Sequence, residues 1–167
     1  MTKNNLWSDN RGLSIVEALA ALLILTLGII PSFLIVLLGN SLSASVINNL
    51  IASNLAQEGI EVTRSIRDSN WMSNTSFDSS LADGTYRVVW NSTALLPESG
   101  NPVLKRDANG LYNYTTGIDT SFVRKIIITK IDPTGCNCEL KIVSEISWAE
   151  KKNTRTISVE SHLFNWR

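Results

Sequence analysis

The sequence predicts an α+β protein in which one long N-terminal helix packs against an antiparallel β-sheet. Three observations predict this fold. The run from Ala18 to Leu38 contains no charged residue, and apolar residues then recur every three or four positions as far as Ile66. In the second half of the chain, several short stretches alternate apolar and polar residues. The first two patterns are typical of helix, and the third is typical of half-buried strands.

Charge and composition exclude several classes of function. The chain has 15 Lys and Arg residues against 15 Asp and Glu residues, so it lacks the basic excess of a nucleic-acid-binding protein, and nucleic acid is not an expected partner. His162 is the only histidine, and no phosphate-binding loop, dinucleotide fingerprint or metal quartet is present. We therefore expect no enzyme activity, cofactor or metal.

Residues 13–38 form the predicted membrane segment. The 21 uncharged residues from Ala18 to Leu38 make a helix of about 31 Å, close to the hydrocarbon thickness of a bilayer. One acid, Glu17, lies at its start, and an unpaired carboxylate in lipid costs roughly 2.5–3.5 kcal/mol on insertion scales. An ordinary secretory signal has a shorter apolar run, although Ser43-Ala44-Ser45 offers a small-x-small cleavage pattern. Neither a signal nor a plain single-span anchor explains the acid.

The stretch Arg11-Gly12-Leu13-Ser14-Ile15-Val16-Glu17 resembles the N-terminal signal of type IV prepilins and the related pseudopilins. In that family a short polar leader ends in Gly, and the fifth residue of the mature protein is Glu. The resemblance implies that residues 1–12 are a leader, that prepilin peptidase cleaves between Gly12 and Leu13, and that the new terminus at Leu13 is N-methylated. The family most often has Phe at this first mature position, but it accepts other hydrophobic residues.

The same resemblance implies an assembly role for Glu17. After cleavage, Leu13 carries a charged amine, and four helical residues span about 6 Å. In a filament core of low dielectric constant, the Glu17 carboxylate would pair with its own terminus or with that of a neighbouring subunit. The alternative is that Glu17 lies beside lipid headgroups, where an acid also suits the start of a helix.

Gly28 and Pro31 interrupt the apolar run. Proline removes a helical hydrogen bond, and glycine disfavours a helix interior. In type IV pilins, such a Gly-to-Pro stretch is where the helix can melt as the subunit lengthens in the filament. The resemblance therefore implies helix flexibility at Gly28 and Pro31, and a kink tolerated in the membrane is the alternative.

Residues 39–68 are predicted to continue the helix in amphipathic form. The apolar stripe that the sheet would cover consists of Ile47, Ile51, Leu55, Gly59, Val62 and Ile66. The end of this helix, from Ala56 to Trp71, closely resembles that of PilV-like minor pilins. The segments Thr120 to Thr129 and Leu163 to Trp166 resemble the same group more loosely.

Residues 69–167 are predicted to be a loop followed by the antiparallel sheet. Strands are expected at 84–92, 103–107, 111–117, 122–132, 139–148 and 154–164, with the last two forming a hairpin. The Asn-Gly pair at Asn109 and Gly110 predicts a tight turn. We expect Trp90, Trp148 and Trp166 to pack the sheet against the helix, with an aromatic ligand site as the alternative.

The two cysteines, Cys136 and Cys138, are separated by one residue. A disulfide between them would be strained, because positions this close rarely offer the required Cα separation. The simpler interpretation is a pair of small, half-buried residues in a loop or at a strand end, with their redox state left open. A zinc site is not expected, because no second pair of ligands is present.

Taken together, these resemblances imply a minor type IV pilin-like subunit. It would enter the bacterial cytoplasmic membrane with its C-terminal domain outside, and then join an extracellular pilus. Its partners would be prepilin peptidase, the lipid bilayer before assembly, other pilin subunits through the helix, and the assembly platform. One alternative is a pseudopilin of a type II secretion system, found in a periplasmic pseudopilus. The other is a single-pass membrane-anchored binding protein that never polymerises.

Overall fold

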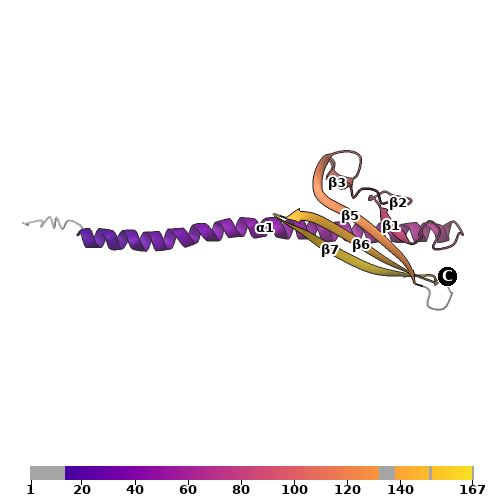
Figure 1. Cartoon of the computed structure of the whole chain (residues 1–167), viewed down its shortest axis with the longest axis horizontal. Helices are drawn as coiled ribbons and strands as arrows, with labels where there is room; N and C mark the ends of the chain where they lie inside the picture. The colour runs from indigo at the N-terminus through magenta and orange to yellow at the C-terminus, as the bar shows by residue number, and fades with distance from the viewer. Residues whose placement is uncertain (1–13, 132–137, 151, 167) are drawn as a thin grey trace, which may run out of the picture. The chain divides into compact units, whose positions relative to one another are not determined.

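A computed structural model describes residues 14–131, 138–150 and 152–166, apart from the side chain of Ser41. Over these residues the chain forms one helix and seven strands, and all the strands belong to one antiparallel sheet (Figure 1). This confirms the predicted fold class. The chain divides into two compact units, Met1–Ala44 and Ser45–Arg167.

The helix α1 spans Ile15–Met72 and therefore contributes to both units. It continues past the predicted end near Arg67, because the following turn folds back on its last residues. The side-chain amide of Asn70 donates to the carbonyls of Phe77 (3.2 Å) and Ser79 (2.6 Å), and the Asn70 carbonyl accepts from the Thr75 backbone N–H at 3.0 Å. These bonds satisfy polar groups at the helix end, so polar residues predicted as loop remain helical.

Strand β5 is the centre of the sheet. Strand β6 pairs along one edge of β5, from Phe122 opposite Trp148 to Ile131 opposite Glu139. Strands β3 and β1 share the other edge, with β3 on the first part of β5 and β1 on the later part. The outer pairs are β2 with β1, β4 with β3, and β7 with β6. The strand bounds are β1 Gly84–Arg87, β2 Leu96–Pro97, β3 Val103–Arg106, β4 Tyr112–Asn113, β5 Ile118–Ile131, β6 Glu139–Glu150 and β7 Asn153–Phe164.

Most of the predicted strands are confirmed, including the final hairpin of β6 and β7 and the tight turn between β3 and β4. In that turn Gly110 has a φ of +84°, and the Asp107 carboxylate accepts from the backbone N–H groups of Asn109 (2.8 Å) and Leu111 (2.9 Å). The prediction for 84–92 is wrong in its second half. Strand β1 ends at Arg87, because the hydroxyl and backbone N–H of Ser92 both bond to the backbone of Val89 and form a turn.

Small residues on α1 let the helix approach the sheet closely. A Cβ atom added at Gly59 would lie 2.6 Å from both the Ile126 Cδ1 and the Ser144 Oγ atoms. Ala52 and Ala56 are buried on the same face of the helix. The predicted stripe is covered by the sheet only from Ile51 onward.

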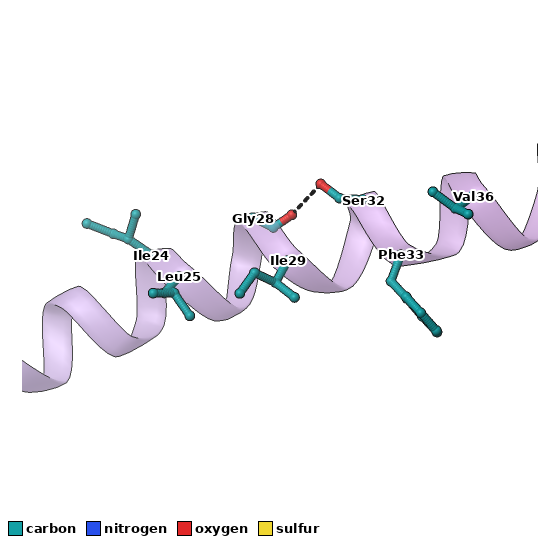
Figure 2. A pocket seen from close by; sticks show the side chains of 7 residues that line it. All are labelled: Ile24, Leu25, Gly28, Ile29, Ser32, Phe33 and Val36. Atoms are coloured by element: carbon teal, nitrogen blue, oxygen red, sulfur yellow. Dashed lines mark hydrogen bonds between the residues drawn. The ribbon is translucent and has the colours of Figure 1, made fainter.

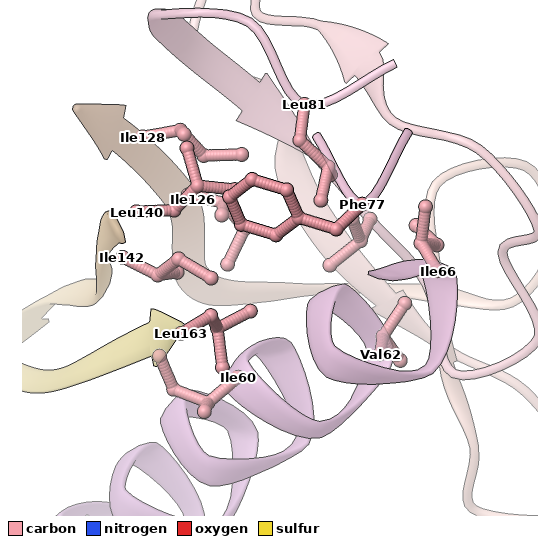
Figure 3. Close-up of a cluster of buried hydrophobic side chains, with 11 residues drawn as sticks. Ile60, Val62, Ile66, Phe77, Leu81, Ile126, Ile128, Leu140, Ile142 and Leu163 are labelled. Carbon is pink, nitrogen blue, oxygen red and sulfur yellow. The ribbon is translucent and has the colours of Figure 1, made fainter. Parts of the chain in front are cut away.

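The core between α1 and the sheet consists of two clusters of buried side chains. The first is drawn in Figure 3, where residues of α1 and of the turn after it point toward residues of β5, β6 and β7; its labelled members are Ile60, Val62, Ile66, Phe77, Leu81, Ile126, Ile128, Leu140, Ile142 and Leu163. The second is built around Leu55, Ile146 and Trp148.

Trp148 confirms one of the three tryptophan predictions, because it is buried and its ring lies 6.0 Å from that of Phe122. The prediction for Trp90 is wrong, because Trp90 lies in the turn after β1 with half of its surface exposed. Trp166 is 73% exposed beyond the end of β7, so it is not part of the buried core. It contacts the helix through Trp71, the ring of which it meets edge to face.

A buried guanidinium joins three parts of the second unit. Arg124 on β5 is fully buried, and its Nη1 atom lies 2.7 Å from the Glu58 carboxylate on α1. The same side chain donates to the carbonyls of Leu55 (3.2 Å) and Val88 (2.5 Å). A buried charge needs such partners to offset its lost hydration.

Candidate functional site: the apolar segment of the helix

The first unit contains the candidate site, which is the stretch of α1 from Ile15 to Leu38. Its large apolar side chains are between 52% and 79% exposed, and they lie on all sides of the helix. This helix is long and apolar enough to cross a membrane by length and composition. A helix that is apolar all round requires a surrounding of lipid or protein.

The few hydroxyl groups in this stretch are already hydrogen-bonded within the helix. Thr26 Oγ1 donates to the Leu23 carbonyl at 2.9 Å, and Ser32 Oγ donates to the Gly28 carbonyl at 2.8 Å. These bonds leave fewer polar groups to satisfy when the segment is surrounded by hydrocarbon.

Gly28 and Ser32 form the floor of a shallow groove along the helix, which Figure 2 shows. Apart from the adjacent residues and the backbone of the helix itself, no atom lies within 4 Å of a Cβ added at Gly28, so the groove is open there. Its volume is about 660 Å³, and its sides are formed by Ile24, Leu25, Ile29, Phe33 and Val36. Small residues four positions apart are a known packing motif of membrane helices. This spacing is present in the sequence, although Ser32 was not among the predicted site residues.

Helix α1 runs without interruption through Gly28 and Pro31. The predicted melting concerns a subunit inside a filament, so it stays a prediction for the assembled state. The helical conformation in the single chain is compatible with the alternative, in which the membrane tolerates the proline.

Glu17 lies in the first turn of α1 and is exposed to solvent. Within the part of the chain that the structure describes, its carboxylate has no ion-pair partner. The predicted leader, the cleavage site at Gly12 and Leu13, and the amine that would pair with Glu17 lie outside the described residues. The structure places the acid at the start of the apolar segment, and the charge pair stays a prediction.

Cys138 takes part in a disulfide bond. Cys136, the other half of the predicted pair, lies outside the described residues, so their pairing stays a prediction. Among the residues that the structure describes, no group of three or more His, Cys, Asp or Glu side chains could hold a metal ion.

The single histidine belongs to a charged network on β6 and β7. His162 Nδ1 lies 2.5 Å from the Glu139 carboxylate, and its Nε2 lies 3.0 Å from that of Glu160, which also binds Lys141 at 2.7 Å. Hydrogen bonding to Glu139, and then to Glu160, raises the pKa of His162. The bond from Lys141, followed by that from His162, lowers the pKa of Glu160. This network joins two strands on the solvent side of the sheet.

Comparison of the chain with protein-family models, with curated proteins and with solved structures gives no match. The function is therefore inferred from the geometry of the apolar segment and from the sequence around Glu17.

Proposed function

We propose that the protein is a minor type IV pilin-like subunit, cleaved by prepilin peptidase between Gly12 and Leu13 and packed into a filament through its N-terminal helix. One observation carries this proposal. A segment of α1 exposes apolar side chains on all sides and has a single carboxylate, Glu17, in its first turn. Lipid alone would satisfy the apolar side chains, but it would not satisfy the acid.

Cleavage would create the missing partner for Glu17. The amine of a mature Leu13 would lie about 6 Å along the helix axis from the acid, and the amine of an adjacent subunit could approach closer. In a dry helical bundle, two opposite charges attract far more strongly than in water. Because each subunit supplies one acid and one amine, neighbouring helices would neutralise one another.

The groove at Gly28 and Ser32 supports side-by-side packing of these helices. Small residues allow two helix backbones to approach closely, so that van der Waals contacts replace contacts with lipid. The flanking side chains of Ile29 and Phe33 would then enclose the helix of an adjacent subunit. This role needs no catalytic group, because the subunit acts through assembly and contact.

The proposal also fixes a location for each stage. Before assembly, the apolar segment would lie in the cytoplasmic membrane of a bacterium with the β-sheet unit outside. After assembly, the same segment would lie in the core of an extracellular pilus. The partners are then prepilin peptidase, the bilayer, the assembly platform and other pilin subunits.

The test uses a bacterial host that carries prepilin peptidase and a pilus assembly system. We expect mass spectrometry to find a mature N-terminal peptide that starts at methylated Leu13. The variant Glu17→Gln should enter sheared filaments at least about tenfold less than the wild type, because tenfold corresponds to only 1.4 kcal/mol of the charge pair. The matched control is Glu61→Gln, which removes an exposed acid from the other half of the same helix.

Two results would overturn the proposal. One is a membrane-bound protein that still starts at Met1 in cells with active peptidase. The other is equal incorporation of the Glu17→Gln variant and the wild type into filaments. If the wild type and the Glu17→Gln variant both stayed in the membrane and neither entered filaments, a single-span anchored binding protein would be favoured instead.

A further inference from the structure

A polar cleft lies at the C-terminal end of α1, wholly within the second unit. Its volume is about 400 Å³, which lies in the range of about 300–1,000 Å³ that is usual for small-ligand sites. Three segments line it, namely the end of the helix, the turn after it and the C-terminal tail; the lining residues are Trp71, Asn74, Thr75, Ser76, Phe77 and Asn165.

One lining residue, Trp71, contacts a second tryptophan, Trp166, which follows the lining residue Asn165 in the chain. The rings of Trp71 and Trp166 meet edge to face, with centroids 4.9 Å apart and an interplanar angle of 71°. The guanidinium of Arg67 lies 4.2 Å from the centroid of the Trp71 ring, so Trp71 is held between a cation and a second ring. Trp166 is 73% exposed and therefore presents ring surface to solvent.

Backbone hydrogen bonds hold the walls of the cleft in place. The Asn74 N–H donates to the Trp71 carbonyl at 3.1 Å, and the Asn165 N–H donates to the Cys138 carbonyl at 2.8 Å. Asn74 has a φ of +56°, a left-handed conformation that asparagine tolerates better than most residues. A site held in this way needs little ordering when a ligand binds.

The lining chemistry selects a neutral ligand rich in hydroxyl groups. The polar lining side chains are amides and hydroxyls, and none of the six lining residues carries a charge. Among the described residues, the side-chain amides of Asn74 and Asn165 have no hydrogen-bond partner in the protein. The carbonyl end of a helix also disfavours an anion. An exposed indole ring provides a flat apolar surface that matches the C–H face of a sugar ring.

We propose that this cleft binds a neutral carbohydrate, with one sugar ring stacked on Trp166 and its hydroxyl groups bonded to the amides of Asn74 and Asn165. The proposal depends only on the second unit, so it holds whether or not the protein assembles into a filament.

The test uses the full chain in lipid nanodiscs, because alkyl-glycoside detergents carry sugar headgroups that would compete. The probes are cellohexaose, maltohexaose and chitohexaose as neutral oligosaccharides, and a heparin hexasaccharide as a charged comparison. We expect saturable binding of at least one neutral probe at millimolar or lower concentration, measured by saturation-transfer NMR and tryptophan fluorescence. The heparin hexasaccharide should bind at least tenfold more weakly (about 1.4 kcal/mol).

Substitutions at the cleft separate specific from general binding. Trp166→Ala should weaken binding of the neutral probe about tenfold, whereas Trp166→Phe should retain most of it because a ring remains. The matched control is Trp90→Ala, which removes another exposed tryptophan far from the cleft in sequence and should leave binding unchanged. Circular dichroism should show the same melting transition in all three variants.

The proposal is wrong if none of the three neutral oligosaccharides binds at millimolar concentration. It is also wrong if Trp166→Ala binds as the wild type does, or if Trp90→Ala loses binding to the same extent. None of these three results would affect the proposed assembly of the N-terminal helix, which is tested through Glu17.

Discussion

Two glycines on the same helix have opposite surroundings. At Gly28 an added Cβ would meet no atom within 4 Å, whereas at Gly59 it would lie 2.6 Å from atoms of β5 and β6. The side chains around them differ in the same way. Large apolar residues between Ile15 and Leu38 are exposed, whereas those from Leu55 to Ile66 that face the sheet are buried.

The comparison shows that one continuous helix can contain two kinds of packing surface. The surface at Gly59 already has its partner within the chain, because the sheet occupies the space that a side chain would need. The surface at Gly28 is also apolar, but no other part of the described chain covers it. Under the proposed function, its partner would be the helix of another subunit. A small residue on a helix therefore indicates a close approach without specifying whether the approaching group belongs to the same molecule.

In the half of α1 that the sheet covers, Glu58→Ala should cause the largest loss of stability. This change leaves the guanidinium of Arg124 fully buried with only carbonyl groups as acceptors. Removal of one member of a buried pair typically costs 3–5 kcal/mol, and because Glu58 is partly exposed we expect a loss of about 3 kcal/mol in the free energy of unfolding. Urea unfolding of the full chain, followed by tryptophan fluorescence, measures this loss.

Glu61→Ala is the matched control for Glu58→Ala. Glu61 pairs with Arg64 at 2.6 Å, but both side chains are exposed, so its removal should change stability by at most about 0.5 kcal/mol. Equal losses of stability in the two variants would show that the buried pair of Glu58 and Arg124 stabilises the second unit no more than an exposed pair does.

A leucine at each glycine tests the comparison directly. Gly59→Leu should lower the free energy of unfolding of the second unit by about 2 kcal/mol, because the new side chain must displace Ile126 and Ser144. Gly28→Leu should leave that free energy unchanged, but it should weaken association between helices in a bilayer by about 1 kcal/mol through filling the groove. Urea unfolding and energy transfer between labelled chains in vesicles measure the two effects.

The smallest expected effect is a pH dependence from the network on β6 and β7. Because its pKa is raised above 6.5, His162 contributes stability that is complete below pH 6.5 and is lost as the pH rises through the raised value. Because its pKa is lowered below 4.5, Glu160 contributes stability that is present above pH 4.5 and is lost as the pH falls. The contribution of this network to stability should therefore be highest between pH 4.5 and 6.5.

His162→Gln provides the check on this pH dependence. The variant should lose the decline in the urea midpoint above pH 6.5 and retain the decline at acid pH. A wild-type midpoint that stays constant from pH 6 to about 9 would contradict the assignment to His162. The apolar half of α1 contains no residue of this network, so it should show no such pH dependence.

The fold was largely predictable because local patterns determine its longest elements. The periodicity of the helix and the alternation in β5, β6 and β7 were strong enough to place them to within a few residues. The prediction failed where tertiary contacts override local pattern. Trp90 follows an alternating stretch, but a turn closed by Ser92 removes it from the sheet. The final turn of α1 depends on bonds from Asn70 to residues that follow the helix.

The candidate site was predictable in part for a related reason. Glu17, Gly28 and Pro31 are visible in the sequence because a charge, a glycine and a proline stand out in an apolar run. Ser32 matters only through its spacing from Gly28, and a single serine in such a run gives no signal by itself. The pairing of Arg124 with Glu58 connects residues far apart in the sequence, and no local pattern signals it. The cleft near Trp166 likewise requires the C-terminal tail to meet the helix end.

The position of β5 has a consequence for the order in which the protein becomes structured during synthesis. Strands β1 and β3 are made first, but their pairings with β5 cannot form until Ile118–Ile131 has emerged. The face of α1 that packs against the sheet also stays uncovered until β5 has emerged. Nascent chains that stop before β5 should therefore form at most the two short local pairings of β1 with β2 and β3 with β4, and should depend on chaperones, because pairings between distant residues form late.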